Sequence, residues 1–128
     1  MGWALVIIGS ALGGMARYGV SGAVARRIGE SFPWGTLVVN ASGSFVIGLF
    51  AALLAPGGAV AGKEAAGLFV MTGLCGGYTT FSSFSLQTLN LVRDGEWLRA
   101  VVNIVASTAL CLLAVSAGFA LGAFIPGG

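Results

Sequence analysis

The sequence predicts an all-α integral membrane protein with four transmembrane helices, the third of which is broken at the membrane midplane. Apolar residues make up 57% of the 128 residues, and charged residues only 8%. Soluble domains are roughly 25% charged. The few charges divide the chain into four long apolar stretches, and a helix needs about 20 apolar residues to cross a bilayer. Without a polar outer face, a soluble helical bundle is excluded.

The four stretches form a single membrane domain over residues 1–128. Each begins near a break in the apolar pattern, and three of them begin close to Trp3, Trp34 or Trp97. Tryptophan prefers the membrane–water interface, so these residues support the expected edges. The expected spans are about 2–24, 33–55, 65–92 and 98–124.

The loop charges predict an orientation in the membrane. The first loop, expected over Arg26–Glu30, and the third, over Arg93–Glu96, lie on one side and hold three arginines, with Arg99 next to them. The second loop holds only Lys63. The positive-inside rule therefore favours the first and third loops in the cytoplasm.

The composition also excludes several classes of function. The chain has no histidine, and both cysteines lie inside apolar stretches. All four acidic residues fall in loops, so no span carries a carboxylate that could couple transport to protons. No nucleophile–base pair or metal cluster suggests an enzyme, and a net charge of +2 does not suggest a nucleic-acid partner.

The third span carries the strongest sign of a site. Residues 65–92 form an uncharged stretch of 28 residues, more than one straight crossing needs. Gly76, Gly77 and a following Thr/Ser run favour a break near Gly76–Thr79. Unwound backbone at this depth is tolerated only inside protein or along a cavity, and transporters bind ions at such breaks.

Other polar and aromatic residues within the spans allow two interpretations each. Asn40 either lines a pore or joins helices by hydrogen bonds, as Thr36 and Ser44 on the same helical face are expected to do. Phe81 and Phe84 either pack or present positive ring edges to an anion. Three further residues, Asn103, Ser107 and Cys111, share a face of span 4, where helix packing is the more ordinary role.

Arg17 is the only charge well inside a span. It either extends to the interface or lies in a water-filled vestibule that attracts anions. We favour the vestibule, because the preceding glycine pair allows close packing.

Three motifs resemble the signatures of the CrcB/Fluc fluoride channels: GGMARY at 13–18, GTLVVNASGSF at 35–45 and GGYTTFSSF at 76–84. The resemblance covers spans 1 to 3 and agrees in length and span count. It implies a passive, fluoride-selective channel of microbial plasma membranes, which exports fluoride and is not an enzyme. It further implies an antiparallel, dual-topology homodimer in membrane lipid.

The same resemblance assigns roles to individual residues. It places a structural sodium ion at the dimer interface, held by the backbone carbonyls of Gly76 and Thr79. The implied fluoride pathway includes Asn40, Phe81, Phe84 and Ser107. We add the hydroxyls of Thr80 and Ser82 to it and expect Arg17 at the anion vestibule. Fluoride is small and strongly hydrated, so close donors must replace its water without trapping it.

The chain departs from the family pattern at two positions. Gln87 stands where the family often has Glu, and Cys111, a weaker donor, stands at a position often held by a hydroxyl residue.

We weighed two rival functions. A small multidrug exporter would need a Glu in span 1, which is absent. A membrane scaffold would not explain an interruption of the third span.

Overall fold

The computed structural model describes residues 2–29 and 31–125, and all regular structure in these ranges is helical. The elements are α1 (Gly2–Ile28), α2 (Trp34–Leu54), α3 (Glu64–Gly67), η1 (Leu68–Cys75), α4 (Gly76–Tyr78), α5 (Phe81–Arg93) and α6 (Trp97–Phe124). Element η1 is π-helical. The expected loop residue Glu30 lies outside the described residues.

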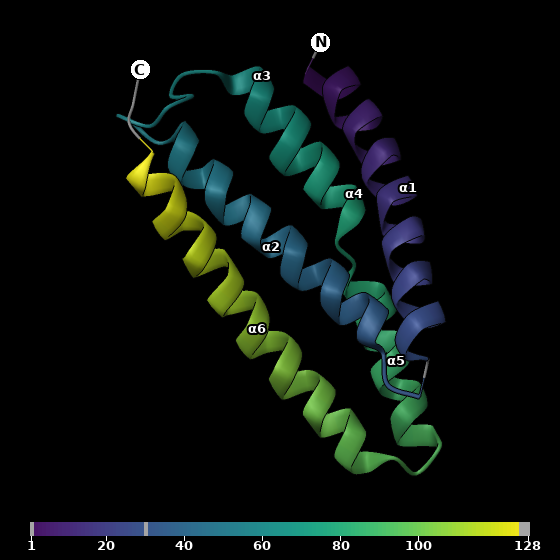
Figure 1. Ribbon diagram of the computed structural model, residues 1–128. Helices are drawn as coiled ribbons and strands as arrows, with labels where there is room; N and C mark the ends of the chain where they lie inside the picture. Colours follow the sequence, from purple (N-terminus) through teal and green to yellow (C-terminus); the bar gives the residue numbers. More distant parts are fainter. Residues whose placement is uncertain (1, 30, 126–128) are drawn as a thin grey trace.

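The helices form four passes that run side by side (Figure 1). Helices α2 and α6 pack along their lengths, and α1 packs against η1 and α4. The α2–α3 connection lies at the same end as the start of α1 and the end of α6, while the connections around residues 31 and 95 lie at the other end. In the described ranges, three helices are long and apolar enough to cross a membrane: α1, α2 and α6. The remaining pass is made of shorter pieces, from α3 to α5.

Helix α1 is longer than expected, and the predicted loop at Arg26–Glu30 was wrong in its first part. Arg26 and Arg27 form the last helical turn, where basic side chains interact favourably with the helix dipole. Gly29 ends the helix with φ +94° while its amide donates to the carbonyl of Ala25 at 2.8 Å. A left-handed glycine is a common helix stop, because no Cβ opposes that conformation.

The third pass is interrupted later than expected. Gly76, Gly77 and Tyr78 are helical, so of the break expected near Gly76–Thr79 only Thr79 lies in non-helical backbone. Thr79 and Thr80 are extended instead, with ψ angles of 157° and 115°. The β-branched threonines tolerate extended backbone well, and Gly77 serves close packing: a Cβ there would meet the backbone of Ser10 in α1.

Glycines also let α2 and α6 approach closely. A Cβ on Gly48 would run into the carbonyl of Val115, and one on Gly118 into that of Phe45. Small residues at helix contacts are typical of membrane bundles, where backbones pack by direct approach.

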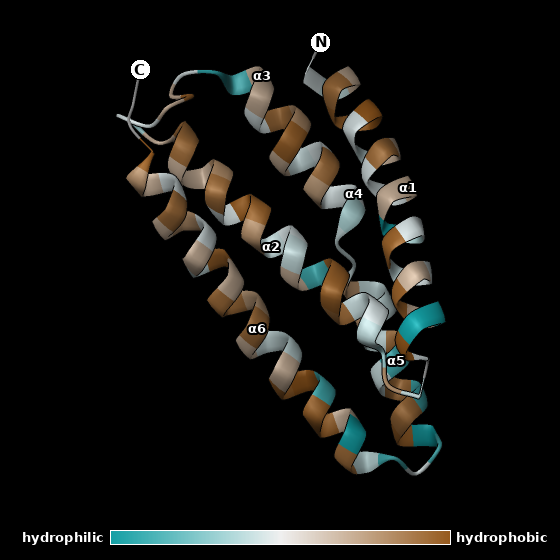
Figure 2. Ribbon diagram, in the orientation of Figure 1, coloured by the Kyte–Doolittle hydropathy of each residue, from teal (hydrophilic) through white to brown (hydrophobic). Residues whose placement is uncertain are grey.

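The outer surface of the bundle is apolar. Figure 2 shows hydrophobic residues along most of α6 and along the half of α2 nearer α3, with more hydrophilic residues toward the opposite ends of both helices. Large apolar side chains are open to the surroundings, among them Phe81 at 78% exposed, Leu98 at 76% and Leu113 at 66%. Exposure on this scale requires lipid or another protein chain as cover.

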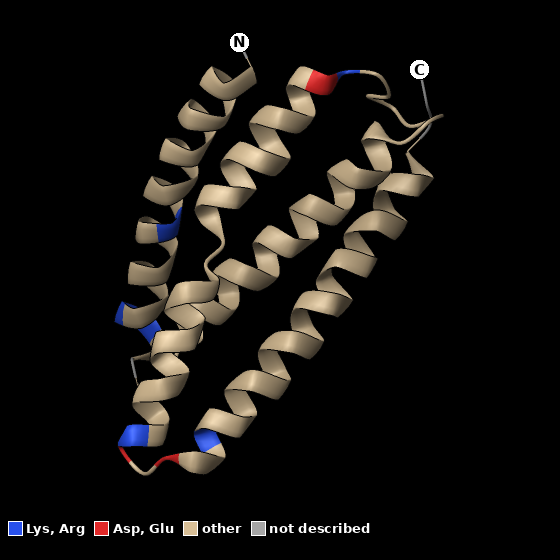
Figure 3. Cartoon of the chain, turned by 180° about the vertical axis from the view of Figure 1, so that it is seen from behind, with Lys and Arg blue, Asp and Glu red and all other residues tan. Residues whose placement is uncertain are grey.

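Apart from Arg17, partway along α1, the charged residues gather at the two ends of the bundle (Figure 3). Most lie at the end where α5 meets α6. Lys63 and Glu64 lie at the opposite end, beside the start of α3. The described residues thus place the expected first and third loops together at the more basic end.

Candidate functional site

The interruption between α4 and α5 is held by one side chain from α2. The carboxamide of Asn40 donates from Nδ2 to the carbonyl of Thr80 at 2.9 Å and accepts the Thr80 amide on Oδ1 at 2.7 Å. The two bonds fix which way the amide group faces, because the Thr80 N–H needs an acceptor and its carbonyl a donor. Asn40 therefore pairs with Thr80 as a neighbouring strand would.

This pairing redirects amides that a continuous helix would use within itself. In such a helix the Thr80 amide would bond to the carbonyl of Gly76, and the Ser83 amide to that of Thr79. Here Thr80 donates to Asn40, and Ser83 donates to the hydroxyl of Thr80 at 3.1 Å, which caps the start of α5. The carbonyls of Gly76 and Thr79 lose their helical donors as a result.

Neighbouring residues pack the interruption against α2. The Tyr78 hydroxyl lies 2.9 Å from the Ser42 hydroxyl. A Cβ on Gly43 would collide with the methyl group of Thr79 and would lie 3.1 Å from the Tyr78 ring. Asn40 and Gly43 lie one turn apart on α2 and both face the interruption. Asn40 offers it hydrogen bonds, and Gly43, which has no side chain, leaves room for it.

Phe81 and Phe84 begin α5 immediately after the interruption. Their ring centroids lie 5.6 Å apart at an interplanar angle of 44°. Phe81 is 78% exposed, and Phe84 is half-buried. Beside them, the exposed Ser82 lies 3.2 Å from the Thr80 hydroxyl. Two ring edges and two hydroxyl groups thus share one region of the chain.

Polar residues of α6 connect to α5 through a directed chain of hydrogen bonds. Ser107 donates to Asn103 at 3.2 Å, Asn103 donates to the Thr88 hydroxyl at 2.8 Å, and Thr88 donates to the carbonyl of Phe84 at 2.7 Å. Asn103 is only 1% exposed and Ser107 6%. The chain of bonds joins α6 to the turn of α5 that carries Phe84. Cys111, one turn beyond Ser107, is half-buried.

A cavity of 810 Å³ lies between α1, the start of α2, α5 and the start of α6. Its lining includes three arginines, Arg17, Arg26 and Arg99, and it reaches Thr80 and Ser83 at the interruption. Among residues 2–29 and 31–125, Arg17 has no carboxylate within ion-pair distance. Gln87 lines the same cavity, and its buried Oε1 has no partner among the described atoms.

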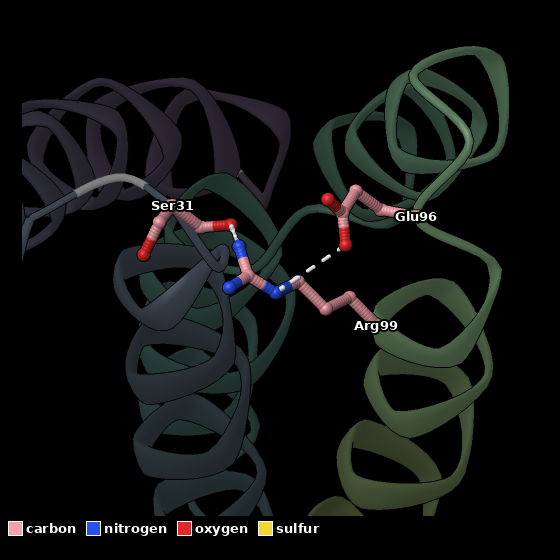
Figure 4. Close-up of polar contacts among 3 residues, drawn as sticks. All are labelled: Ser31, Glu96 and Arg99. Atoms are coloured by element: carbon pink, nitrogen blue, oxygen red, sulfur yellow. Dashed lines mark hydrogen bonds and ion pairs between the residues drawn. The ribbon is translucent and has the colours of Figure 1, made fainter.

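Arg99, one of the residues that line the cavity, reaches toward Ser31 and Glu96 (Figure 4). It donates from Nη1 to the carbonyl of Ser31 at 3.1 Å, and its Nε lies 3.6 Å from Glu96. Both charged side chains are about half exposed, so the ion pair adds little stability. The contact with Ser31 ties the α1–α2 connection to the first turn of α6.

The structure brings together most of the residues singled out in the sequence. Asn40, Thr80, Phe81, Ser82 and Phe84 lie at the interruption, and Arg17 lines the cavity that reaches it. Ser107 lies apart, connected through Asn103. Sequence reasoning missed the Asn40–Thr80 pairing and the role of Thr88, since neither is visible in residue spacing along one helix.

Together, the fold and site define a helical membrane protein with an interrupted pass and an arginine-lined cavity leading to it. The family model described as CrcB-like protein, Camphor Resistance (CrcB), matches residues 4–119. The chain belongs to this family.

Curated relatives agree with the assignment. The chain is 58% identical over 118 residues to a protein of Methylocella silvestris called a fluoride-specific ion channel, covering 92% of this chain and 90% of the relative. It is 58% identical over 113 residues to one of Opitutus terrae with the same name, covering 88% and 86%. A third, from Methylobacterium radiotolerans, is 54% identical over 124 residues, covering 97% and 86%, and also carries that name.

Proposed function

We propose that this chain is the subunit of a fluoride-selective passive channel, as the names of its relatives indicate for them. The observation that carries the proposal is the meeting of Asn40, Phe81 and Phe84 at an interrupted helix, below a cavity lined by three arginines. The cavity lining also includes Asp94 and Glu96 from the α5–α6 connection. The interruption itself has no carboxylate among the described residues, which suits an anion and provides no proton coupling.

Passage begins in the cavity, where Arg17 raises the local anion concentration without a paired carboxylate. At the inner end of the cavity, protein groups replace the water molecules that hydrate fluoride. These groups are the hydroxyls of Thr80 and Ser82, the second Nδ2 hydrogen of Asn40 and the ring edges of Phe81 and Phe84. All of these are neutral groups, so binding is favourable but weak enough for release. Ser107 extends the route only when its hydroxyl turns from Asn103 to the anion.

A structural sodium ion fits the carbonyl set at the interruption. The carbonyls of Gly76 and Thr79 have lost their helical donors, Gly76 is exposed, and nothing lies within 4 Å of its Cβ direction. Two such carbonyls from each of two chains would give four oxygen ligands around a two-fold axis. When bound, sodium supplies a positive charge that satisfies these oxygens and joins the subunits.

We propose an antiparallel homodimer in the plasma membrane of a microbe, exporting fluoride that has accumulated in the cytoplasm. The exposed apolar faces supply surface for both a partner chain and lipid. Against dual insertion stands the excess of arginine at one end, which favours a single orientation.

Fluoride efflux from liposomes tests the function. Purified protein in vesicles loaded with potassium fluoride should release fluoride when valinomycin dissipates the potential, at the same rate with or without a proton gradient. Vesicles loaded with chloride are the control. Release of both anions at similar rates would contradict selectivity, and a strict need for a proton gradient would contradict a channel.

A further inference from the structure

Asn40 does more at the interruption than a pathway-lining role requires. Its carboxamide uses both of its polar ends on one backbone residue, with bonds of 2.9 Å to the carbonyl and 2.7 Å to the amide of Thr80. Only the second hydrogen of Nδ2 is left for an anion. We propose that Asn40 is a positioning residue that builds the interruption, by imitating the edge of a β-strand opposite Thr80.

The extended backbone at Thr79 and Thr80 needs such a partner. Both residues are flanked by helix, and Thr80 is 7% exposed, so its amide and carbonyl cannot rely on bulk water. An unpaired buried backbone group costs about 1–3 kcal/mol, and two would disfavour the extended form relative to a continuous helix. Asn40 satisfies both groups from a rigid helix.

Asn40 also contributes to the release of the carbonyls of Gly76 and Thr79. By holding the Thr80 amide, it withholds that donor from the Gly76 carbonyl. By holding Thr80 in place, it sets the hydroxyl that takes the Ser83 amide from the Thr79 carbonyl. The two carbonyls proposed to bind sodium are thus made available by one side chain that does not touch the ion.

Another residue of α2 also accommodates the interruption. Gly43, one turn after Asn40, gives room for the Thr79 methyl group and the Tyr78 ring. Ser44, also one turn away, is different: its hydroxyl donates to the carbonyl of Asn40 within the same helix at 2.7 Å. Ser44 therefore provides a matched control, a polar residue close to Asn40 whose described hydrogen bond stays within α2.

Hydrogen–deuterium exchange tests the positioning role without reference to transport. In Asn40→Ala, the Thr80 amide loses its acceptor beside the cavity, and exchange at Thr80 should become roughly tenfold faster. In Asn40→Asp, the acceptor oxygen remains, so the amide should stay protected. Ser44→Ala and Phe84→Ile should exchange as the unaltered protein does. Unchanged or slower exchange at Thr80 in Asn40→Ala would overturn the inference.

A second readout, which rests on the proposed function, concerns sodium. Fluoride efflux from Asn40→Ala should need at least about tenfold more sodium for half-maximal rate, because the carbonyls are no longer held for the ion. Phe84→Ile should lower the maximal rate and leave the sodium requirement unchanged. If the unaltered protein passes no fluoride, the proposed function fails while the exchange result still decides the role of Asn40. An unaltered sodium requirement in Asn40→Ala would overturn the link to the cation site.

Discussion

The bond between Asn103 and Thr88 gives a prediction whose size follows from the structure. Asn103 is almost fully buried, and it is the described side chain that joins α6 to α5 by a hydrogen bond. Interhelical hydrogen bonds in membrane proteins contribute about 0.6 kcal/mol on average and up to about 1.7. Thr88 retains its own acceptor, the Phe84 carbonyl, when Asn103 is removed. The buried Ser107 hydroxyl loses the Asn103 side chain, but a serine in a helix can donate instead to the carbonyl one turn before it. Asn103→Ala should therefore lower the free energy of unfolding by only about 1 kcal/mol.

Removing the other partner should cost more. In Thr88→Val the shape is kept, but the Asn103 amide stays buried without an acceptor, a loss of about 2–3 kcal/mol. The double variant should be no less stable than Thr88→Val alone, because the orphaned amide is then absent. Unfolding of the purified protein by a denaturing detergent, in a two-by-two cycle, measures all three values. Additive losses, or a larger loss in Asn103→Ala than in Thr88→Val, would refute the reasoning.

Three further predictions concern the proposed pathway. Phe81→Ile and Phe84→Ile keep an apolar side chain but remove the positive ring edge, so fluoride efflux should fall at least about tenfold with normal folding; full efflux in both would assign the rings to packing. Arg17→Gln should slow efflux severalfold at low salt and much less at 1 M salt, where the screening length is about 3 Å. Arg27→Gln, outside the cavity, is its control, and an equal effect in both would deny Arg17 a vestibule role. Ser31→Cys, with Cys75 and Cys111 replaced by Ala, should react with impermeant maleimide from both sides of intact cells if the chain inserts in both orientations; reaction from one side would refute dual topology.

The course of the chain followed from simple rules, and its finer features did not. Charge spacing located the four passes, because lipid demands long uncharged helices. Helix α1 ends later than the charge pattern predicts, because arginine is a good helix former and is favoured in the last turn. The sequence predicts a break near Gly76–Thr79 on grounds of helix propensity, but Gly76 and Gly77 remain helical, and Gly77 provides close contact with α1.

The candidate site was predictable in composition but not in connectivity. Asn40, Phe81 and Phe84 stood out because an amide and two aromatic rings in spans without carboxylates suit an anion. That Asn40 pairs with Thr80, 40 residues away, depends on how α2 crosses the third pass, which spacing within one helix cannot reveal. The same holds for Asn103 and Thr88, whose contact depends on how α5 meets α6.

The most direct test of the central claim is the reversal potential of purified channels in a planar bilayer, with equal concentrations of sodium fluoride on one side and sodium chloride on the other. For a fluoride-selective channel, the current should reverse at a potential far from zero, displaced by about 59 mV for each tenfold of selectivity. The sign of this potential should be the one expected for fluoride moving from the sodium fluoride side to the sodium chloride side. A current that reverses at zero, or a displacement of the opposite sign, would contradict the account.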